Sequence, residues 1–92
     1  MYQGYTNYET WDVVVMIDND WNLYSSKQLW FEENPTITAE SVRDFVRGLN
    51  FFRTLEKVNW EEVANDWRSE LQERNQIQRA RRNNKEQALN GH

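Results

Sequence analysis

The chain of 92 residues contains no cysteine, one proline and three glycines. Without cysteine it cannot form a disulfide framework or use thiolates for metal binding or redox chemistry, which fits a reducing cytoplasm. So few glycines and prolines disfavour a many-turned sandwich or barrel, and they favour long helices joined by few loops. The longest apolar run, Val13–Ile17, is far shorter than the roughly 20 residues that cross a bilayer, and the first ten residues do not resemble a signal peptide. We therefore expect a cytoplasmic protein with no membrane contact.

Side chains that carry common catalytic chemistry are also scarce. The only histidine is the terminal residue, His92, so a Ser/His/Asp or Cys/His arrangement cannot form. Three scattered glycines do not make a phosphate-binding loop. The paired glutamates, at positions 32–33 and 61–62, match solvated helix ends better than an acid/base pair. The sequence predicts a protein that is not an enzyme and that needs no cofactor.

One short segment resembles the start of a calcium-binding loop. Asp18, Asp20 and Asn22 occupy its first, third and fifth positions, where alternate oxygens would wrap around the ion. The loop requires Gly at position six and a bidentate Glu at position twelve, and this chain has Leu23 and Leu29 there. We interpret the three polar residues as helix caps and turn residues, and we expect no metal site.

Charge is unevenly distributed along the chain. The net charge is −4, but residues 1–73 hold fourteen acidic and six basic residues, a net of −8. Residues 74–92 hold five basic residues and one acidic residue, a net of +4. The acidic part should repel nucleic acid, whereas the basic cluster could contact phosphates or could serve as a solubilising helix end. The candidate nucleic-acid residues are Arg79, Arg81, Arg82 and Lys85.

Two segments in the second half carry clear helical signals. In the first, apolar residues follow Thr38, a natural N-cap, and Ile37 and Val42 occupy the positions of a hydrophobic staple. In the second, Asn59 is placed to cap the helix and Glu62 to complete a capping box. The apolar stripes are Val42, Phe45, Val46, Leu49 and Phe52 in the first segment, and Trp60, Val63, Ala64, Trp67 and Leu71 in the second.

The apolar pattern thins to Ile77 alone after Leu71. We expect the last helix to run from about Trp60 to about Arg82 and to close a single helical domain over residues 1–82. Residues 83–92 are polar, and we expect them to form a disordered tail.

The N-terminal half allows two interpretations of residues 10–19. Thr6 and Glu9 have capping-box spacing ahead of this segment, which favours a helix. Its β-branched valines would also suit a strand, and the fold would then be α+β. A further helix is expected from Asn19 or Asp20 to about Glu33, ending before Asn34-Pro35. Together the signals predict an all-α bundle of three to four helices with a long C-terminal helix.

Aromatic residues are the most distinctive part of the composition, with five Trp, four Tyr and four Phe. Large aromatics fill a small core efficiently, and they are also enriched at the hot spots of protein interfaces. We expect a core that includes Trp11, Phe45, Leu49, Trp67 and Leu71. The candidate partner-binding residues are Trp21, Trp30, Glu32, Glu33, Glu61 and Glu62.

The segments Asn7-Tyr8-Glu9-Thr10-Trp11 and Ile17-Asp18-Asn19-Asp20, followed by Leu23-Tyr24, form the pattern N-x-x-T-W…I-x-N-D-x-x-L-Y. The pattern resembles one found in small uncharacterised proteins of phages, plasmids and bacteria, except that Asn22 replaces the Gly before Leu-Tyr. This resemblance implies a mobile-element origin. In physical terms, Asn7 and Thr10 would fix a helix start and Trp11 would anchor the core. Asn19 and Asp20 would end one helix and cap the next.

These observations favour a protein that binds another protein. Because small acidic phage proteins often block host proteins, we expect an inhibitor of a host protein, such as a defence nuclease or a polymerase, that acts through an acidic helical surface. The alternatives are a small nucleic-acid-binding or regulatory protein that uses the basic C-terminal segment, and an accessory protein that oligomerises through an aromatic face.

Overall fold

The computed structural model describes residues 1–90, with side chains from residue 1 to residue 81. Over these 90 residues the fold is all-α, as predicted, and the only strand-like feature is a single antiparallel bridge between Tyr2 and Tyr5. Residues 10–19 are helical, so the α+β alternative is wrong. The helices are α1 (Tyr8–Asn19), α2 (Trp21–Glu33), α3 (Ala39–Gly48) and α4 (Trp60–Asn90).

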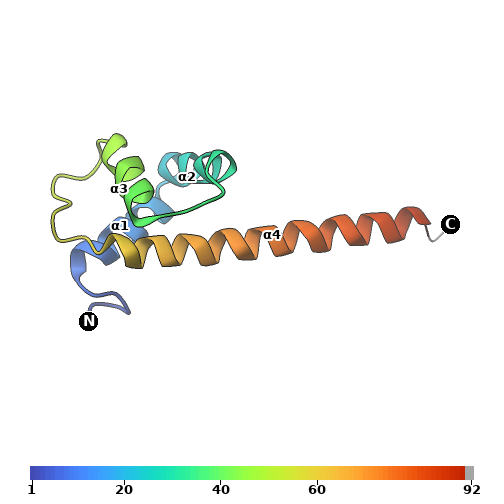
Figure 1. The fold of residues 1–92 in the computed structure, drawn as a ribbon, viewed down its shortest axis with the longest axis horizontal. Helices are drawn as coiled ribbons and strands as arrows, with labels where there is room; N and C mark the ends of the chain where they lie inside the picture. Colours follow the sequence, from blue (N-terminus) through green and yellow to red (C-terminus); the bar gives the residue numbers. More distant parts are fainter. Residues whose placement is uncertain (91–92) are drawn as a thin grey trace.

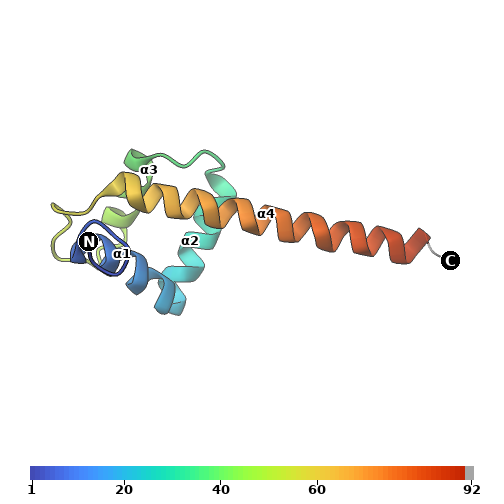
Figure 2. The same ribbon diagram turned by 90° about the horizontal axis from the view of Figure 1, so that it is seen from below.

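The first three helices gather around the N-terminal half of α4 (Figure 1). The C-terminal half of α4 continues past them with no other element beside it, and Figure 2 shows the same arrangement from a second direction. The molecule is therefore elongated, with extents of 57 × 26 × 23 Å. None of the helices described is both long and apolar enough to cross a membrane.

Trp67 lies at the centre of the core and is only 2% exposed. The ring centroids of Trp30, Phe31 and Phe45 lie 5.6, 5.8 and 5.9 Å from that of Trp67, so α2, α3 and α4 meet around one indole. Of the predicted core residues, Phe45, Leu49 and Leu71 pack at the edge of this core. The buried apolar residues are Val13, Val14, Ile17, Phe31, Ile37, Val42, Val46, Val58, Val63, Ala64 and Trp67.

The predicted cap of the first helix is wrong by one residue. Asn7, not Thr6, is the N-cap of α1, and its side-chain oxygen accepts a hydrogen bond from the Thr10 backbone N at 3.0 Å. The hydroxyl of Thr10 also donates to this oxygen, at 2.6 Å. The physical interpretation of the motif placed the start of this helix at Asn7 and Thr10, and these hydrogen bonds confirm that placement.

The start of α4 is tied to the start of α1. Asn59 accepts from the Glu62 backbone N, as a cap should, at 3.2 Å. The predicted box does not close, because the Glu62 carboxylate accepts from the backbone N and the hydroxyl of Thr6, at 2.7 and 2.6 Å. The Asn59 backbone N donates instead to the buried hydroxyl of Thr10, at 2.9 Å. Long-range partners thus replaced the local bond that the spacing predicted.

The third helix begins as predicted and ends early. Thr38 is its N-cap, and Ile37 and Val42 are both buried. The helix ends at Gly48, so Leu49 and Phe52, which belong to the predicted stripe, pack against the core from the following loop. Asn50 in this loop has a φ of 54°, a left-handed conformation that stops a helix from continuing.

The last helix is longer than predicted, because α4 continues to Asn90 instead of ending near Arg82. Residues 75–81 are all exposed, and we call residues 75–90 the arm. The disorder predicted for residues 83–92 stays a prediction, since the side chains of residues 82–90 and all of residues 91 and 92 lie outside the part described.

We expect a truncation that ends at Arg82 to fold like the full chain. Among the residues whose side chains are described, the buried core ends at Trp67 and its last edge residue is Leu71, well before Arg82. Near-ultraviolet circular dichroism, which reports the packing of the tryptophans, should be unchanged. Loss of that signal in the truncated chain would show that the C-terminal segment docks on residues 1–73, which we call the body.

Candidate functional site

The outer face of α2 exposes two large apolar side chains. Trp21 is 76% exposed and Leu29 is 63% exposed, and helical spacing places them with Ser25 on one side of α2. The Trp21 ring stacks on that of Tyr24, with centroids 6.2 Å apart and an angle of 28° between the planes. One face of the indole is thereby held in place while the rest meets solvent. Of the two aromatic residues predicted to bind a partner, Trp21 is the one that is exposed.

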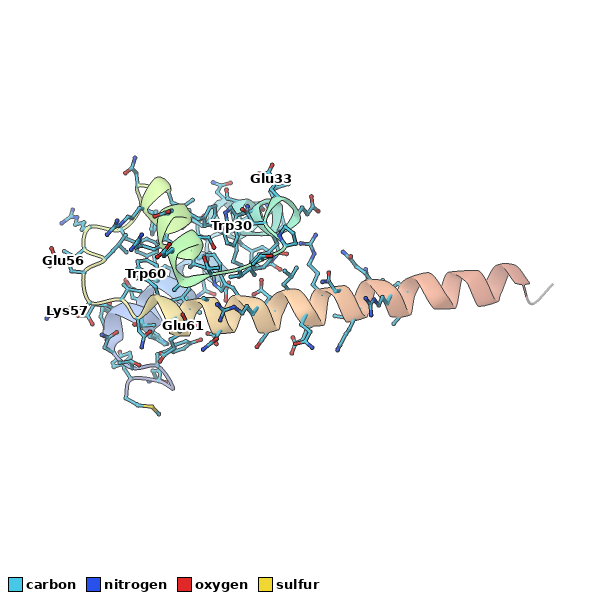
Figure 3. The ribbon with its side chains drawn as sticks, viewed as in Figure 1. Trp30, Glu33, Glu56, Lys57, Trp60 and Glu61 are labelled. Atoms are coloured by element: carbon cyan, nitrogen blue, oxygen red, sulfur yellow. The ribbon has the colours of Figure 1, made fainter. Side chains whose placement is uncertain are left out.

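Trp30, the other predicted aromatic, lies on the opposite side of α2. It is half-buried, and its ring packs against Phe45 at 5.2 Å and against Trp67 at 5.6 Å. Figure 3 shows Trp30 between α2 and α3, whereas Glu33 points outward from the end of α2. Trp30 therefore belongs to the core and not to the proposed surface.

The predicted acidic residues do not form one surface. Glu32 and Glu33 are exposed at the end of α2, near Leu29 along the helix, and Glu32 pairs with Arg74 at 2.9 Å. Glu61 and Glu62 lie instead in the first turn of α4. There Glu61 pairs with Arg68 at 3.1 Å, and Glu62 holds Thr6. The end of α2 therefore places two exposed carboxylates about one turn from the exposed Leu29, whereas Trp21 lies at the start of the same helix.

A second aromatic surface was not predicted from the sequence. Tyr2, Tyr8 and Trp11 form a cluster with ring centroids 5.1 to 5.7 Å apart, and Tyr8 is half exposed. Trp11 is thus not the core anchor that was expected, because it packs against the N-terminal tyrosines at the edge of the molecule. The turn that brings Tyr2 back over α1 contains Gln3 and Gly4, both with positive φ. A sequence pattern on α1 alone could not reveal it.

The polar residues between α1 and α2 act as helix ends, with one exception. Asn19 is the last residue of α1, and Asp20 caps α2 by accepting from the Leu23 backbone N at 3.0 Å. Asp18 does not cap but reaches Lys27 on α2. In the described residues no group of three or more His, Cys, Asp or Glu side chains is arranged to hold a metal ion.

Lys27 is the one fully buried charged side chain among the residues described, with 0% exposure. Its ammonium donates to Asp18 at 2.5 Å and to Glu70 at 2.8 Å, and so it joins α1, α2 and α4. The rings of Tyr24, Phe31 and Trp67 lie 5.2 to 5.8 Å from the nitrogen, within cation–π range. An ammonium so enclosed cannot reach a substrate, and it orients the three helices. No sequence pattern marked this residue.

A second polar contact joins the N-terminal segment to α4, where the Tyr5 hydroxyl donates to the Asp66 carboxylate. Burial, together with this hydrogen bond and the negative charge of Asp66, raises the pKa of Tyr5 above its ordinary value of 10.0. The hydroxyl therefore stays protonated in the folded protein at a pH where it ionises in the unfolded chain.

We expect Tyr5 to make the protein less stable at alkaline pH. Above pH 10 the unfolded chain releases the Tyr5 proton and the folded protein keeps it, so the free energy of unfolding falls as pH rises. Urea unfolding at pH 8 and pH 11 should show a larger loss for the wild type than for Tyr5→Phe, which has no proton to release. Equal losses would contradict the role of Tyr5.

The predicted nucleic-acid residues belong to the arm. Arg79 and Arg81 are exposed, and neither forms an ion pair with a described residue. The side chains of Arg82 and Lys85 lie outside the part described. Arg74, at the base of the arm, is held by α2 through Glu32 and through the carbonyl oxygen of Gln28 at 3.3 Å.

Comparison with known proteins identifies no relative. The chain matches no protein-family model, and it has no significant similarity to a curated protein or to a solved structure.

Proposed function

We propose that this protein is a non-enzymatic module that binds another protein through the outer face of α2. The observation that carries the proposal is the exposure of Trp21 at the start of α2 and of Leu29 near its end, with the exposed carboxylates of Glu32 and Glu33 about one turn beyond Leu29. An exposed tryptophan with one face already held by a neighbour loses little side-chain entropy on binding, and tryptophan is among the commonest hot-spot residues.

The charge of the body selects the kind of partner. Residues 1–73 carry a net of −8, which attracts a basic surface and repels phosphates. The partner should therefore offer an apolar pocket for Trp21 surrounded by Lys or Arg. The mobile-element resemblance would make it a cytoplasmic host protein, and occupation of a basic groove, as in a nuclease or a polymerase, would make this protein its inhibitor.

Comparative capture from a cell lysate tests the proposal. We expect proteins retained by the immobilised wild type to be lost with Trp21→Ala and with Glu33→Lys, and to be released as salt is raised. Phe51→Ala is the matched control, because Phe51 is also exposed but lies in the loop after α3. Binding through α2 would be refuted if the wild type and all three variants captured the same proteins. It would also be refuted if nuclease treatment removed the captured proteins, because they would then be held by nucleic acid.

The basic arm supports a second candidate, nucleic-acid binding, because Arg79 and Arg81 are exposed on a helix that stands clear of the acidic body. We expect this contact to be weak and non-specific, with a dissociation constant on the order of 10⁻⁴–10⁻⁶ M at physiological salt. Fluorescence anisotropy with a labelled duplex measures it. A dissociation constant below about 10⁻⁸ M, in the range of specific binders, would make nucleic acid the better candidate.

A further inference from the structure

One face of α4 carries an exposed apolar residue between opposite charges, at the point where the helix leaves the body. Ile77 is 54% exposed, and Glu73 and Arg81 lie one turn before it and one turn after it on the same face. Neither charged side chain forms an ion pair with a described residue. Both are exposed, so a molecule that approaches this face can contact them.

The same three side chains line an open groove beside α2. It has a volume of about 390 Å³, and its other wall is formed by Tyr24 and Gln28. The exposed Trp21 stacks on Tyr24. A second helix that crosses the arm at Ile77 would enter this groove, and it would bury Ile77 against an apolar residue of its own.

We propose that two copies of the chain pair through this face, with their arms antiparallel around Ile77. In such a pair, each residue after Ile77 in one copy lies opposite a residue before Ile77 in the other copy. The two residues are the same number of positions from Ile77. Arg81 of one copy then faces Glu73 of the other, and the two-fold axis repeats this contact. The inference does not rest on the proposed partner surface of α2.

The charge distribution of the whole chain favours this orientation. Residues 1–73 carry −8 and residues 74–92 carry +4, so antiparallel arms bring the basic end of each copy toward the acidic body of the other. Parallel arms would bring like charges together along their length. The contact has only one large apolar residue per described arm, so we expect a dimer in the micromolar range whose dissociation constant rises with salt.

Sedimentation equilibrium of the full chain over a range of concentrations tests the inference. The wild type should change from monomer to dimer, and Glu73→Arg or Arg81→Glu alone should weaken dimerisation tenfold or more, because each places like charges opposite one another. The double variant E73R/R81E restores opposite charges and should recover most of the affinity. Recovery in the double variant is a result that loss of folding could not produce.

Glu56→Arg and Arg53→Glu make the same charge changes in the exposed loop between α3 and α4, and they should leave dimerisation unchanged. Circular dichroism of each variant confirms that the fold is retained. A wild type that stays monomeric at all concentrations would overturn the proposal. So would single charge reversals without effect, or a double variant no better than the single ones.

Discussion

Replacing Trp67 by Ala is expected to lower the free energy of unfolding by roughly 3–5 kcal/mol. The indole is 2% exposed, and the rings of Trp30, Phe31 and Phe45 surround it from two other helices. Its removal leaves a cavity that neighbouring aromatics on fixed helices cannot easily fill. A typical domain is stable by only about 5–15 kcal/mol, so the variant should lose a large share of its stability.

Chemical denaturation of Trp67→Ala and Trp21→Ala measures this effect with a matched control. Both variants delete an indole, but Trp21 is 76% exposed and its loss should change stability by less than about 0.5 kcal/mol. If the two variants unfolded at the same denaturant concentration, Trp67 would not be the centre of the core.

The second half of the fold could be predicted from the sequence because its signals are local. Thr38 caps α3, and the stripe from Trp60 to Trp67 contains the residues that α4 buries. Both depend on spacing of three or four residues, which a helix brings together whatever surrounds it. Local spacing gave the wrong hydrogen-bond partner where a tertiary contact competes, because the Glu62 carboxylate accepts from Thr6 instead of closing a box with Asn59.

The candidate sites were less predictable, since they depend on which side of a helix faces the core. Trp21 and Trp30 are both tryptophans on α2, and only the packing of α2 on α3 and α4 separates the exposed one from the half-buried one. Trp11 was assigned to the core as the large apolar residue that follows the predicted helix start. The turn at Gln3 and Gly4 instead brings the ring of Tyr2 over Trp11. This turn could not be predicted from the sequence, because it has no periodic pattern of apolar residues.

Removing both carboxylates around Lys27, in the variant Asp18→Asn with Glu70→Gln, is expected to lower the free energy of unfolding by about 3–5 kcal/mol. The ammonium is fully enclosed, so without these partners its charge would be buried with only the weak attraction of aromatic rings to offset lost hydration. Neutral amides keep the shape of the two side chains, so the loss would report charge and not packing. Urea unfolding at neutral pH measures it.

Lys27→Met should behave differently, although it breaks the same two ion pairs. Methionine fills a similar volume between Tyr24, Phe31 and Trp67, and replacing a buried ion pair by an apolar side chain is often neutral. The carboxylates left behind, 39% and 33% exposed, can be hydrated at the surface. We expect a loss of less than about 1.5 kcal/mol. A loss as large as that of the double variant would mean that the ion pairs themselves stabilise the fold. If Lys27→Met lowers the free energy of unfolding less than the double variant does, the main role of Asp18 and Glu70 is to neutralise the buried charge of Lys27. Lys27 itself then fixes how α1, α2 and α4 meet.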